Sequence, residues 1–561
     1  MNAPETASRE PDREHAGADL VGRHRNLGRR TVLVSALTLV SRVLGYAREI
    51  VSAALFGDRS PVFDAFITAW RIPNLFRRFL GEGALSTSFQ TALTETEGRY
   101  GTAAGARLFR ETFRLLFWVL IGVCAVVTGV VALLPDVMPI TGWHWLGADP
   151  EPVRDLTVRV MPFVVFICLS ALVGGALNVR GHFSTPAVAP AALNTVWVLA
   201  LLVIAWHFGW RDEGGALRGE ARHLAMAHWL AWGVLAAGVV QLLVQVPALV
   251  RQGFFHQPRP GGAVRPDGAA RPLDVLKRSA PLALGAAVYQ INVMIDGLMA
   301  EGLLPDGGPT LHYYANRVQQ FPLALIAIAA TSAVFPALQA YGHKGERRAV
   351  RDLHDRTHRA ICFVALPATA GLFALAGPVI AVSFEHGAFG PEGVRRATAC
   401  LQMLTLAILP AGAVGLVART FYALGDFVTP VRVSMVMLVL NVGLNLVCIQ
   451  VFGMDVDGLA LATAVTSWAS LAALLARMPR KLDLPASDLP FLRPVGKMLV
   501  AAIGAGLLAA GMHWSLARYP VLALVAGIAA GMLGYVLLAR RLGVPEARGP
   551  FRRLRRGPGA E

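Results

Sequence analysis

The sequence predicts an all-α polytopic membrane protein with about fourteen transmembrane helices. Of its 561 residues, 55% are hydrophobic and only 16% are charged, whereas soluble domains carry roughly a quarter of charged residues. The mean hydropathy is +0.52. Many apolar stretches reach the roughly 20 residues that a helix needs to cross the hydrocarbon core, where the backbone has to satisfy its own hydrogen bonds.

The expected spans follow one another closely along the chain. No polar stretch between them is long enough to form a separate soluble domain, so the whole chain is treated as one helical membrane protein. In chain order the predicted spans are 31–56, 62–95, 109–135, 154–180, 186–208, 223–250, 272–301, 310–340, 356–384, 393–424, 428–452, 457–478, 492–516 and 519–541.

The loop charges predict the orientation in the membrane. Lys and Arg gather in 251–278, 341–359 and 477–497 and in both terminal segments, while the alternate loops are acidic or neutral. The positive-inside rule places the basic loops in the cytoplasm, so both termini are expected there, which requires an even number of spans. The net charge of +16 follows from this bias. No nucleic-acid-binding motif accompanies it, so no nucleic-acid partner is expected.

Two pairs of similar segments predict an internal repeat. The segment that starts at Arg71 resembles the one at Arg317, about 246 residues later, and Gly181-His-Phe-Ser-Thr-Pro186 resembles Gly425-Asp-Phe-Val-Thr-Pro430, about 244 residues later. Two six-helix lobes in the same orientation, with a substrate site between them, are typical of many transporters. The expected organisation is a disordered cytoplasmic tail (1–28), an N-lobe (29–252), a cytoplasmic linker (253–271), a C-lobe (272–481), a final helix pair (482–541) and a basic cytoplasmic tail (542–561).

Charged residues in the first span mark candidate functional positions, because an ionised side chain in hydrocarbon is expensive unless it faces water or a partner. Arg42 and Glu49 share a helical face with Gly45, while Arg48 points toward another neighbour. Two interpretations stay open for Arg42 and Glu49. They line a wet cavity, or they only form an internal salt bridge.

The second span holds the densest set of polar residues. One helical stripe collects Asp64, Arg71, Asn74, Arg78 and Glu82. Pro73 lacks a backbone N–H and predicts a kink. Gly81 and Gly83 flank Glu82, so a hinge is expected there. Asp64 could be a gating residue, or it could only cap this helix or pair with Arg71.

The arginines predict a cationic cavity. Those within the first, second and eighth spans are Arg42, Arg48, Arg71, Arg77, Arg78 and Arg317. A guanidinium is planar and permanently charged and suits phosphate oxygens, so the cavity is expected to prefer a phosphorylated anion. Arg77 and Arg78 have an alternative, which is to snorkel to a headgroup layer.

A second polar group is a candidate cation site. Asn441 and Asn445 lie one turn apart, Thr463 lies in the next span, and Asp296 lies in span 272–301. Their oxygens would suit a monovalent cation such as Na⁺; hydrogen bonding between helices is the alternative. No catalytic signature is present, so the protein is not expected to be an enzyme. Active transport would then draw on an ion gradient or the membrane potential.

Several motifs together resemble a known family. They are Ser41-Arg-Val-Leu-Gly-Tyr-Ala-Arg-Glu49, Asp64-Ala-Phe66, Asn74-Leu-Phe-Arg-Arg-Phe-Leu-Gly-Glu-Gly-Ala84, Tyr313-Tyr-Ala-Asn-Arg317, Phe384-Glu-His-Gly-Ala-Phe389, Phe421-Tyr-Ala-Leu-Gly-Asp426 and Gly458-Leu-Ala-Leu-Ala-Thr463. Over roughly residues 30–540 the sequence resembles the MurJ (MviN) lipid II flippases of the multidrug/oligosaccharidyl-lipid/polysaccharide exporter superfamily.

The resemblance implies a fold and an activity. The fold is two six-helix lobes plus a C-terminal helix pair (482–541) that forms a groove for a lipid tail. The activity is flipping of lipid II, the undecaprenyl-diphosphate-linked disaccharide pentapeptide, from the cytoplasmic to the periplasmic leaflet of the bacterial inner membrane. Alternating access by a monomer is expected, without a cofactor other than an optional Na⁺. Membrane lipids and cell-wall synthesis proteins are further candidate partners.

The resemblance also assigns residues. The family's cavity arginines fall on Arg42, Arg48, Arg77 and Arg317, with Arg78 and Asn74 beside them. Gating or charge-partner roles fall on Asp64, Arg71, Pro73, Gly81, Glu82, Gly83 and Glu49. A sodium site seen in some members falls on Asp296, Asn441, Asn445 and Thr463.

Three positions depart from the family pattern. Asn316 and Gln320 stand where many members have acids, which makes the cavity more positive. Asn445 stands where sodium-binding members can carry Asp, which removes a charge from the ligand set. The alternative function is export of another lipid-linked oligosaccharide or of drugs by the same superfamily. A drug exporter should show an acidic cavity, which this sequence lacks.

Overall fold

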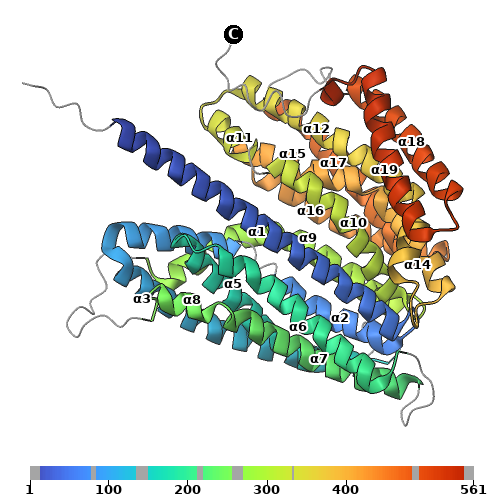
Figure 1. The fold of residues 1–561 in the computed structure, drawn as a ribbon, viewed down its shortest axis with the longest axis horizontal. Helices are drawn as coiled ribbons and strands as arrows, with labels where there is room; N and C mark the ends of the chain where they lie inside the picture. Colours follow the sequence, from blue (N-terminus) through green and yellow to red (C-terminus); the bar gives the residue numbers. More distant parts are fainter. Residues whose placement is uncertain are drawn as a thin grey trace, which may run out of the picture.

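The computed structural model describes residues 13–77, 84–133, 149–210, 219–255, 270–331, 334–482 and 492–548. These residues form helices and no strand. Figure 1 shows two helical bundles that diverge at one end and meet at the other, near the end of α1 (Arg13–Phe56). This arrangement agrees with the predicted all-α membrane fold of two lobes and a C-terminal helix pair.

The first bundle contains the helices up to residue 251. After α1 they are α2 (Pro61–Phe76), α3 (Ala84–Leu133), α4 (Glu151–Val160), α5 (Phe163–Val179), α6 (Ser184–Phe208), α7 (Gly219–Leu243) and α8 (Val246–Arg251). The start of α2 follows from local sequence: the Ser60 hydroxyl accepts a hydrogen bond from the backbone N–H of Phe63 (3.2 Å), and Pro61 needs no donor at the first helical position.

The second bundle continues the chain, and the final helix pair stands on its outer side beside α12 (Figure 1). Its helices are α9 (Pro272–Leu303), α10 (Gly308–Thr331), α11 (Val334–His343), α12 (Arg347–Ala374), α13 (Ala376–Phe384), α14 (Pro391–Thr405), α15 (Ile408–Ala423), α16 (Val428–Leu446), the π-helix η2 (Val447–Val451) and α17 (Val456–Leu482). The pair is α18 (Leu492–Ser515) and α19 (Pro520–Arg541), followed by the 3₁₀ turn η3 (Pro545–Arg548). Helix α9 packs against α2 and α3 as well as α16, so it joins the two bundles.

Ten helices in the described ranges are long and apolar enough to cross a membrane. They fall on ten of the predicted spans. The other four predicted spans, 31–56, 62–95, 272–301 and 310–340, coincide with α1, α2, α9 and α10–α11, which carry the charged residues of the interior. The predicted total of fourteen spans stays a prediction.

Two predicted boundaries differ from the structure. Helix α1 begins at Arg13, so part of the segment expected to be a disordered tail is helical. Residues 84–95, expected to end the second span, belong instead to α3, which is kinked at Gly101 (φ 82°, ψ 171°). Beyond α19, η3 packs back on the bundle, because Val544 and Ala547 are buried and Glu546 pairs with Arg359 (3.2 Å).

The backbone repeats itself between the bundles. Three pairs of glycines with positive φ recur at a separation of 244 residues: Gly101 and Gly345, Gly181 and Gly425, and Gly209 and Gly453. Only glycine adopts such angles at little cost, so these turns are local structure that both halves keep. The spacing equals the one that the sequence match at Gly181 and Gly425 predicts.

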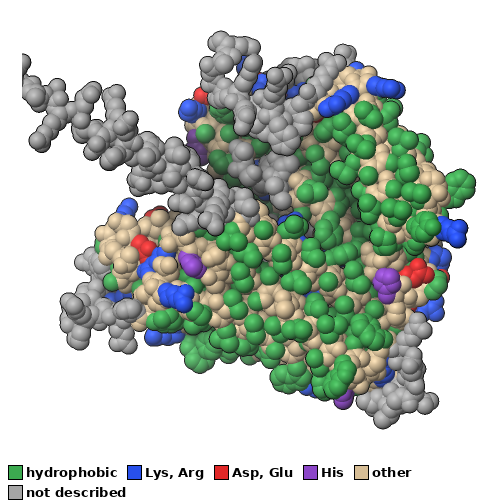
Figure 2. Space-filling view, viewed as in Figure 1, with side chains coloured by type: hydrophobic (Ala, Val, Ile, Leu, Met, Phe, Trp, Pro, Cys, Tyr) green, Lys and Arg blue, Asp and Glu red, His purple; other side chains and the backbone are tan. Residues whose placement is uncertain are grey.

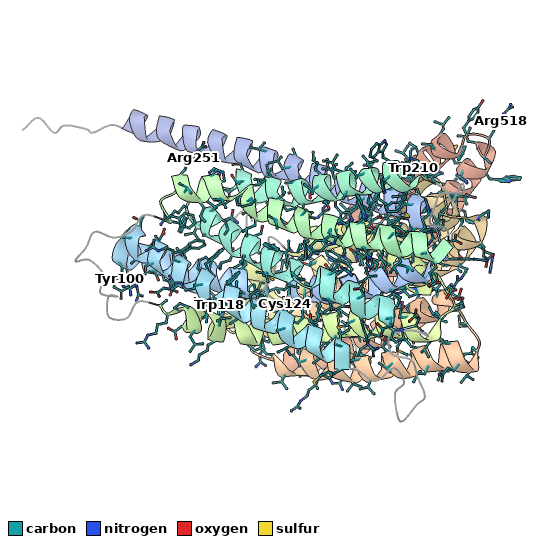
Figure 3. All side chains as sticks on the ribbon, turned by 90° about the horizontal axis from the view of Figure 1, so that it is seen from below. Tyr100, Trp118, Cys124, Trp210, Arg251 and Arg518 are labelled. Atoms are coloured by element: carbon teal, nitrogen blue, oxygen red, sulfur yellow. The ribbon has the colours of Figure 1, made fainter. Side chains whose placement is uncertain are left out.

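The surface shows how the protein meets lipid. Figure 2 shows hydrophobic side chains over the middle of the visible face, with Lys and Arg nearer its edges. Several tryptophans are exposed on the surface, and among them Trp206 is 85% exposed and Trp514 is 84% exposed. Figure 3 places Trp210 and Arg518 at one end of the molecule and Tyr100 and Arg251 toward the other. Amphipathic rings of this kind are typical of the membrane–water interface, and the protein is a multi-pass membrane protein.

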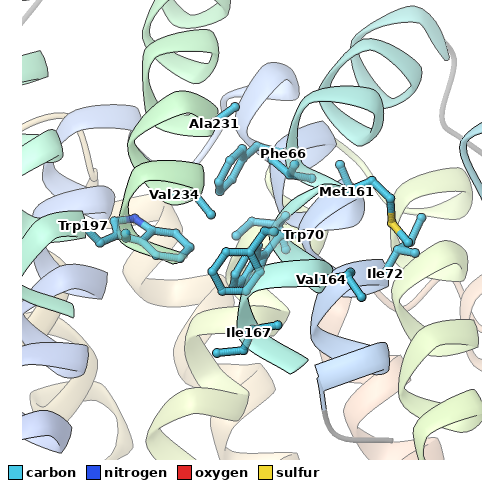
Figure 4. Close-up of a cluster of buried hydrophobic side chains, with 14 of the residues drawn as sticks. Phe66, Trp70, Ile72, Met161, Val164, Ile167, Trp197, Ala231 and Val234 are labelled. Atoms are coloured by element: carbon cyan, nitrogen blue, oxygen red, sulfur yellow. The ribbon is translucent and has the colours of Figure 1, made fainter. Parts of the chain in front are cut away.

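The buried face of α2 anchors the N-lobe core (Figure 4). The Trp70 ring packs edge-on against Trp197 of α6, with ring centroids 4.8 Å apart, and at 5.0 Å against Phe163 of α5. Phe66 is also buried on this face. Aromatic pairs at these distances each add roughly 0.5–1.5 kcal/mol beyond the burial of their area. This packing fixes the rotation of α2 and therefore the direction of its polar residues.

Candidate functional site

A cavity of about 420 Å³ lies between the bundles. Its walls come from α1, α2, α5, α6, α7, α9 and α10. Five arginines line it: Arg42, Arg48, Arg71, Arg77 and Arg317. No Asp or Glu is among the described residues that line it, while amide, hydroxyl and imidazole groups are. The cavity wall is therefore strongly cationic.

A single buried carboxylate links two of these arginines across the lobes. Glu49 Oε1 lies 2.5 Å from Arg48 Nη2 and 3.0 Å from Arg317 Nη2, and it accepts a hydrogen bond from the Tyr313 hydroxyl (2.9 Å). Glu49 is 3% exposed and stands behind the cavity wall. The sequence offered Arg42 as its partner and no acid for Arg317. Side chains that α10 directs toward α1 decide the pairing instead.

The Arg48 guanidinium is held on its other side by residues that the sequence did not single out. Its Nη1 donates to Asn194 Oδ1 of α6 (3.3 Å), and its Cζ lies 4.3 Å from the centroid of the Trp197 ring. The Asn194 amide in turn donates to the Ser41 carbonyl (2.9 Å). One Asn in an otherwise apolar span was the only available signal, and it does not identify a partner 146 residues away in sequence.

The remaining predicted residues of the second span divide into two groups. Asn74 and Arg77 both line the cavity. Asn74 Oδ1 accepts hydrogen bonds from Arg77 Nε (3.1 Å) and Nη2 (2.9 Å). Pro73 lies inside α2, and the predicted kink there stays a prediction. Arg78, Gly81, Glu82 and Gly83 lie outside the described residues, so their roles stay predictions.

The sequence predicts Asp64 to be a gating residue, or else only to cap its own helix or pair with Arg71, and in the structure its carboxylate contacts the start of α10. Asp64 accepts hydrogen bonds from the backbone N–H of Gly307 (2.6 Å) and of Thr310 (3.0 Å), and from the Thr310 hydroxyl (2.5 Å). It therefore caps the start of α10, a helix of the other lobe. The physical reason is that four N–H groups at a helix start need acceptors.

More contacts close the same end of the molecule. The Ala388 N–H donates to the Ala54 carbonyl (2.9 Å), and the Gly390 N–H donates to Asp58 Oδ1 (3.0 Å). Thr68 of α2 donates to Glu301 Oε2 of α9 (2.6 Å). Backbone and side chains of the two lobes thus seal the cavity at the end where α1 terminates.

Some of the candidate cation-site residues are in contact with one another. Asn445 Nδ2 donates to Asp296 Oδ1 (2.8 Å) and to Asn441 Oδ1 (3.3 Å), while Asn445 Oδ1 is buried without a hydrogen-bond partner in the described residues. Thr463 Oγ1 donates to the Leu459 carbonyl (3.0 Å). No group of three or more His, Cys, Asp or Glu suited to a metal occurs in the described ranges. One carboxylate among amide oxygens fits a monovalent cation better than a transition metal.

Comparisons with known proteins agree with this architecture. The family described as lipid II flippase MurJ matches residues 52–533. A lipid II flippase MurJ from Burkholderia cenocepacia is 31% identical over 494 residues, which cover 87% of this chain and 90% of the relative. A probable lipid II flippase MurJ from Rhizobium tropici is 30% identical over 460 residues, 81% of each chain.

Solved structures share the fold. One described as lipid II flippase MurJ in an inward closed conformation superposes with a TM-score of 0.67 at 18% identity, covering 91% of this chain and 99% of the other. An inward-facing multidrug resistance transporter of the MATE family and the MOP superfamily gives 0.60 at 13% identity, with 82% and 99% covered. With a family match over most of its length and relatives of about equal length, the chain belongs to the lipid II flippase MurJ family.

Proposed function

We propose that this protein flips lipid II from the cytoplasmic to the periplasmic leaflet of a bacterial inner membrane. The observation that supports this most strongly is the cavity between the lobes, with five arginines on its wall and no described acid among them. A diphosphate brings several oxygens that suit guanidinium forks. The curated relatives that carry the flippase name agree with this assignment.

The described conformation fits one stage of alternating access. The loops that meet at the closed end, around Asp58, Gly307 and Gly390, are those that the charge pattern assigns to the periplasm. With both termini in the cytoplasm, the cavity of this conformation faces inward. Glu49 then serves as an internal anion that a diphosphate displaces from Arg48 and Arg317.

The membrane potential is the proposed driving force. A cavity that keeps net positive charge after release is drawn back toward the negative interior, and a full elementary charge gains about 2.3 kcal/mol per 100 mV. Asp296, Asn441 and Asn445 would hold Na⁺, with a carboxylate and amide oxygens as ligands, if the Asn445 amide turns its Oδ1 toward the ion. The rest of the proposal does not depend on Na⁺.

The deciding experiment is translocation of lipid II by the purified protein in liposomes, with and without an imposed potential. We expect transport that is faster with a negative interior, and loss of transport when Arg48 or Arg317 is replaced by Gln. Each single variant should still fold, because Glu49 keeps its other arginine, and size-exclusion chromatography and the melting temperature check this. Full transport by the R48Q/R317Q double variant would refute the proposal.

A further inference from the structure

Arg71 is engaged less than Arg48, Arg77 and Arg317, with which it shares the cavity wall. Arg48 and Arg317 share Glu49, and Arg77 donates twice to Asn74. Arg71 Nη2 donates to the Pro309 carbonyl (3.3 Å), while its Nε is buried without a hydrogen-bond partner among the described residues. A guanidinium has five N–H donors, so most of those on Arg71 are uncommitted.

The position of Arg71 depends on Gly297, which has no side chain. Its guanidinium lies directly against Gly297 of α9, and a Cβ built on that glycine would overlap the Arg71 side chain. One turn before Arg71 on α2 and one turn after Gly297 on α9, the Thr68 hydroxyl donates to Glu301 (2.6 Å) and holds the two helices together. Because Gly297 has no side chain, Arg71 fits between α2 and α9 and still reaches the cavity wall.

Two carboxylates on α9 attract the Arg71 guanidinium without forming an ion pair with it. Glu301 and Asp296, both on α9, act on it electrostatically, but no described carboxylate oxygen forms an ion pair with it. The carboxylate of Glu301 is hydrogen-bonded to Thr68, and that of Asp296 to Asn445. Because Arg71 lines the cavity, its Nη donors that no carboxylate engages can turn to a ligand there, whereas its buried Nε cannot.

We propose that Arg71 is a further ligand for the anionic diphosphate of the substrate and that Gly297 is the positioning residue that seats it. Binding at Arg48 and Arg317 has to displace Glu49, whereas binding at Arg71 displaces no acid. A diphosphate carries two phosphoryl groups, and one can engage Arg71 while the other competes for the Glu49 pair. This inference rests on the proposed function and deepens it.

The test is binding of inorganic pyrophosphate to the full-length protein in detergent, measured by isothermal titration calorimetry at fixed ionic strength. R71Q should weaken binding by about tenfold or more, because charge-assisted hydrogen bonds are lost. R71K should recover part of the affinity, since a point charge lacks the fork. G297V should weaken binding as R71Q does, although the charge remains.

The matched control is G122V, on α3, where an added side chain meets no neighbour within 4 Å; it should bind as the wild type does. If Arg71 only tethers α2 to Pro309, R71Q will lower the melting temperature and leave the affinity unchanged, which overturns the inference. If G297V fails to fold, the comparison of R71Q with R71K decides alone. Wild-type protein that binds no pyrophosphate, or R48Q and R317Q variants that bind it normally, would instead count against the proposed function.

Discussion

At the scale of single residues, Glu49 shows how one buried carboxylate organises the site. Its carboxylate forms ion pairs with Arg48 of the same helix and with Arg317 of the other lobe. A buried ion pair is costly to break, because the charge left behind has lost its compensation. The geometry therefore makes Glu49 a structural residue of the cavity as well as a competitor for the substrate.

Replacing Glu49 by Gln should lower the free energy of unfolding by roughly 3–5 kcal/mol, since two guanidinium groups would then lie close together without their shared anion. Thermal unfolding in detergent measures this effect. The exposed pair of Glu392 and Arg395 (2.5 Å) supplies the control, because E392Q should leave the melting temperature unchanged. An unchanged melting temperature for E49Q would contradict the assigned role.

Asn445 is the second residue whose chemistry can be tested alone. Its amide donates to Asp296, where a carboxylate would instead attract a cation. N445D should therefore gain Na⁺ binding, seen as a melting temperature that rises with NaCl but not with choline chloride at equal ionic strength. The same variant with Asp296 replaced by Asn should lose that response. If N445D shows no Na⁺-specific stabilisation, these residues are not a cation site.

At the scale of helices, the cap that Asp64 provides joins α2 to α10. The residue belongs to one lobe and satisfies the helix start of the other. Such a contact forms only when the lobes are close, so it stabilises this end in its closed form. Ser60 gives a comparable cap within the N-lobe, on α2 itself.

D64A should open this end more often, because loss of a cap costs roughly 0.5–2 kcal/mol. A cysteine placed at Ala388 reports on the opening through its rate of labelling by a membrane-impermeant maleimide. We expect faster labelling in the D64A background and an unchanged rate in the S60A background. Equal rates in all three proteins would show that the cap does not hold the lobes together.

At the scale of the whole molecule, two bundles enclose a cationic cavity that is sealed at one end. The seal includes a backbone hydrogen bond from Ala388 to Ala54, from opposite lobes. If transport needs this end to open, holding it shut should stop transport without affecting binding. The cross-link has to be reversible to separate this effect from misfolding.

A disulfide between A54C and A388C, in a background in which the five native cysteines are replaced, should abolish lipid II translocation under oxidising conditions. Reduction should restore it. Each single-cysteine variant should be active in both conditions, and pyrophosphate binding should survive oxidation. Translocation by the fully cross-linked protein would exclude opening at this end.

The sequence by itself determined the class of the fold and the repeat. Apolar stretches of membrane-spanning length are local properties, and the glycine turns at Gly181 and Gly425 are local as well. The arginines could also be found this way, because charge in an apolar span is conspicuous. The charged residues of the cavity wall were therefore available from sequence, whereas Asn194 and the apolar lining residues were not.

The tertiary structure alone decided the interaction partners of the charged side chains. Helical spacing could match Glu49 with Arg42, yet in the structure Glu49 pairs with Arg48 of the same helix and with Arg317 of α10. Asp64 could be matched with Arg71, yet it caps α10, and Arg71 lies on Gly297. Spacing along one helix specifies a face, but the partner of that face comes from a helix some 250 residues away, and only the packing of the lobes brings the two together.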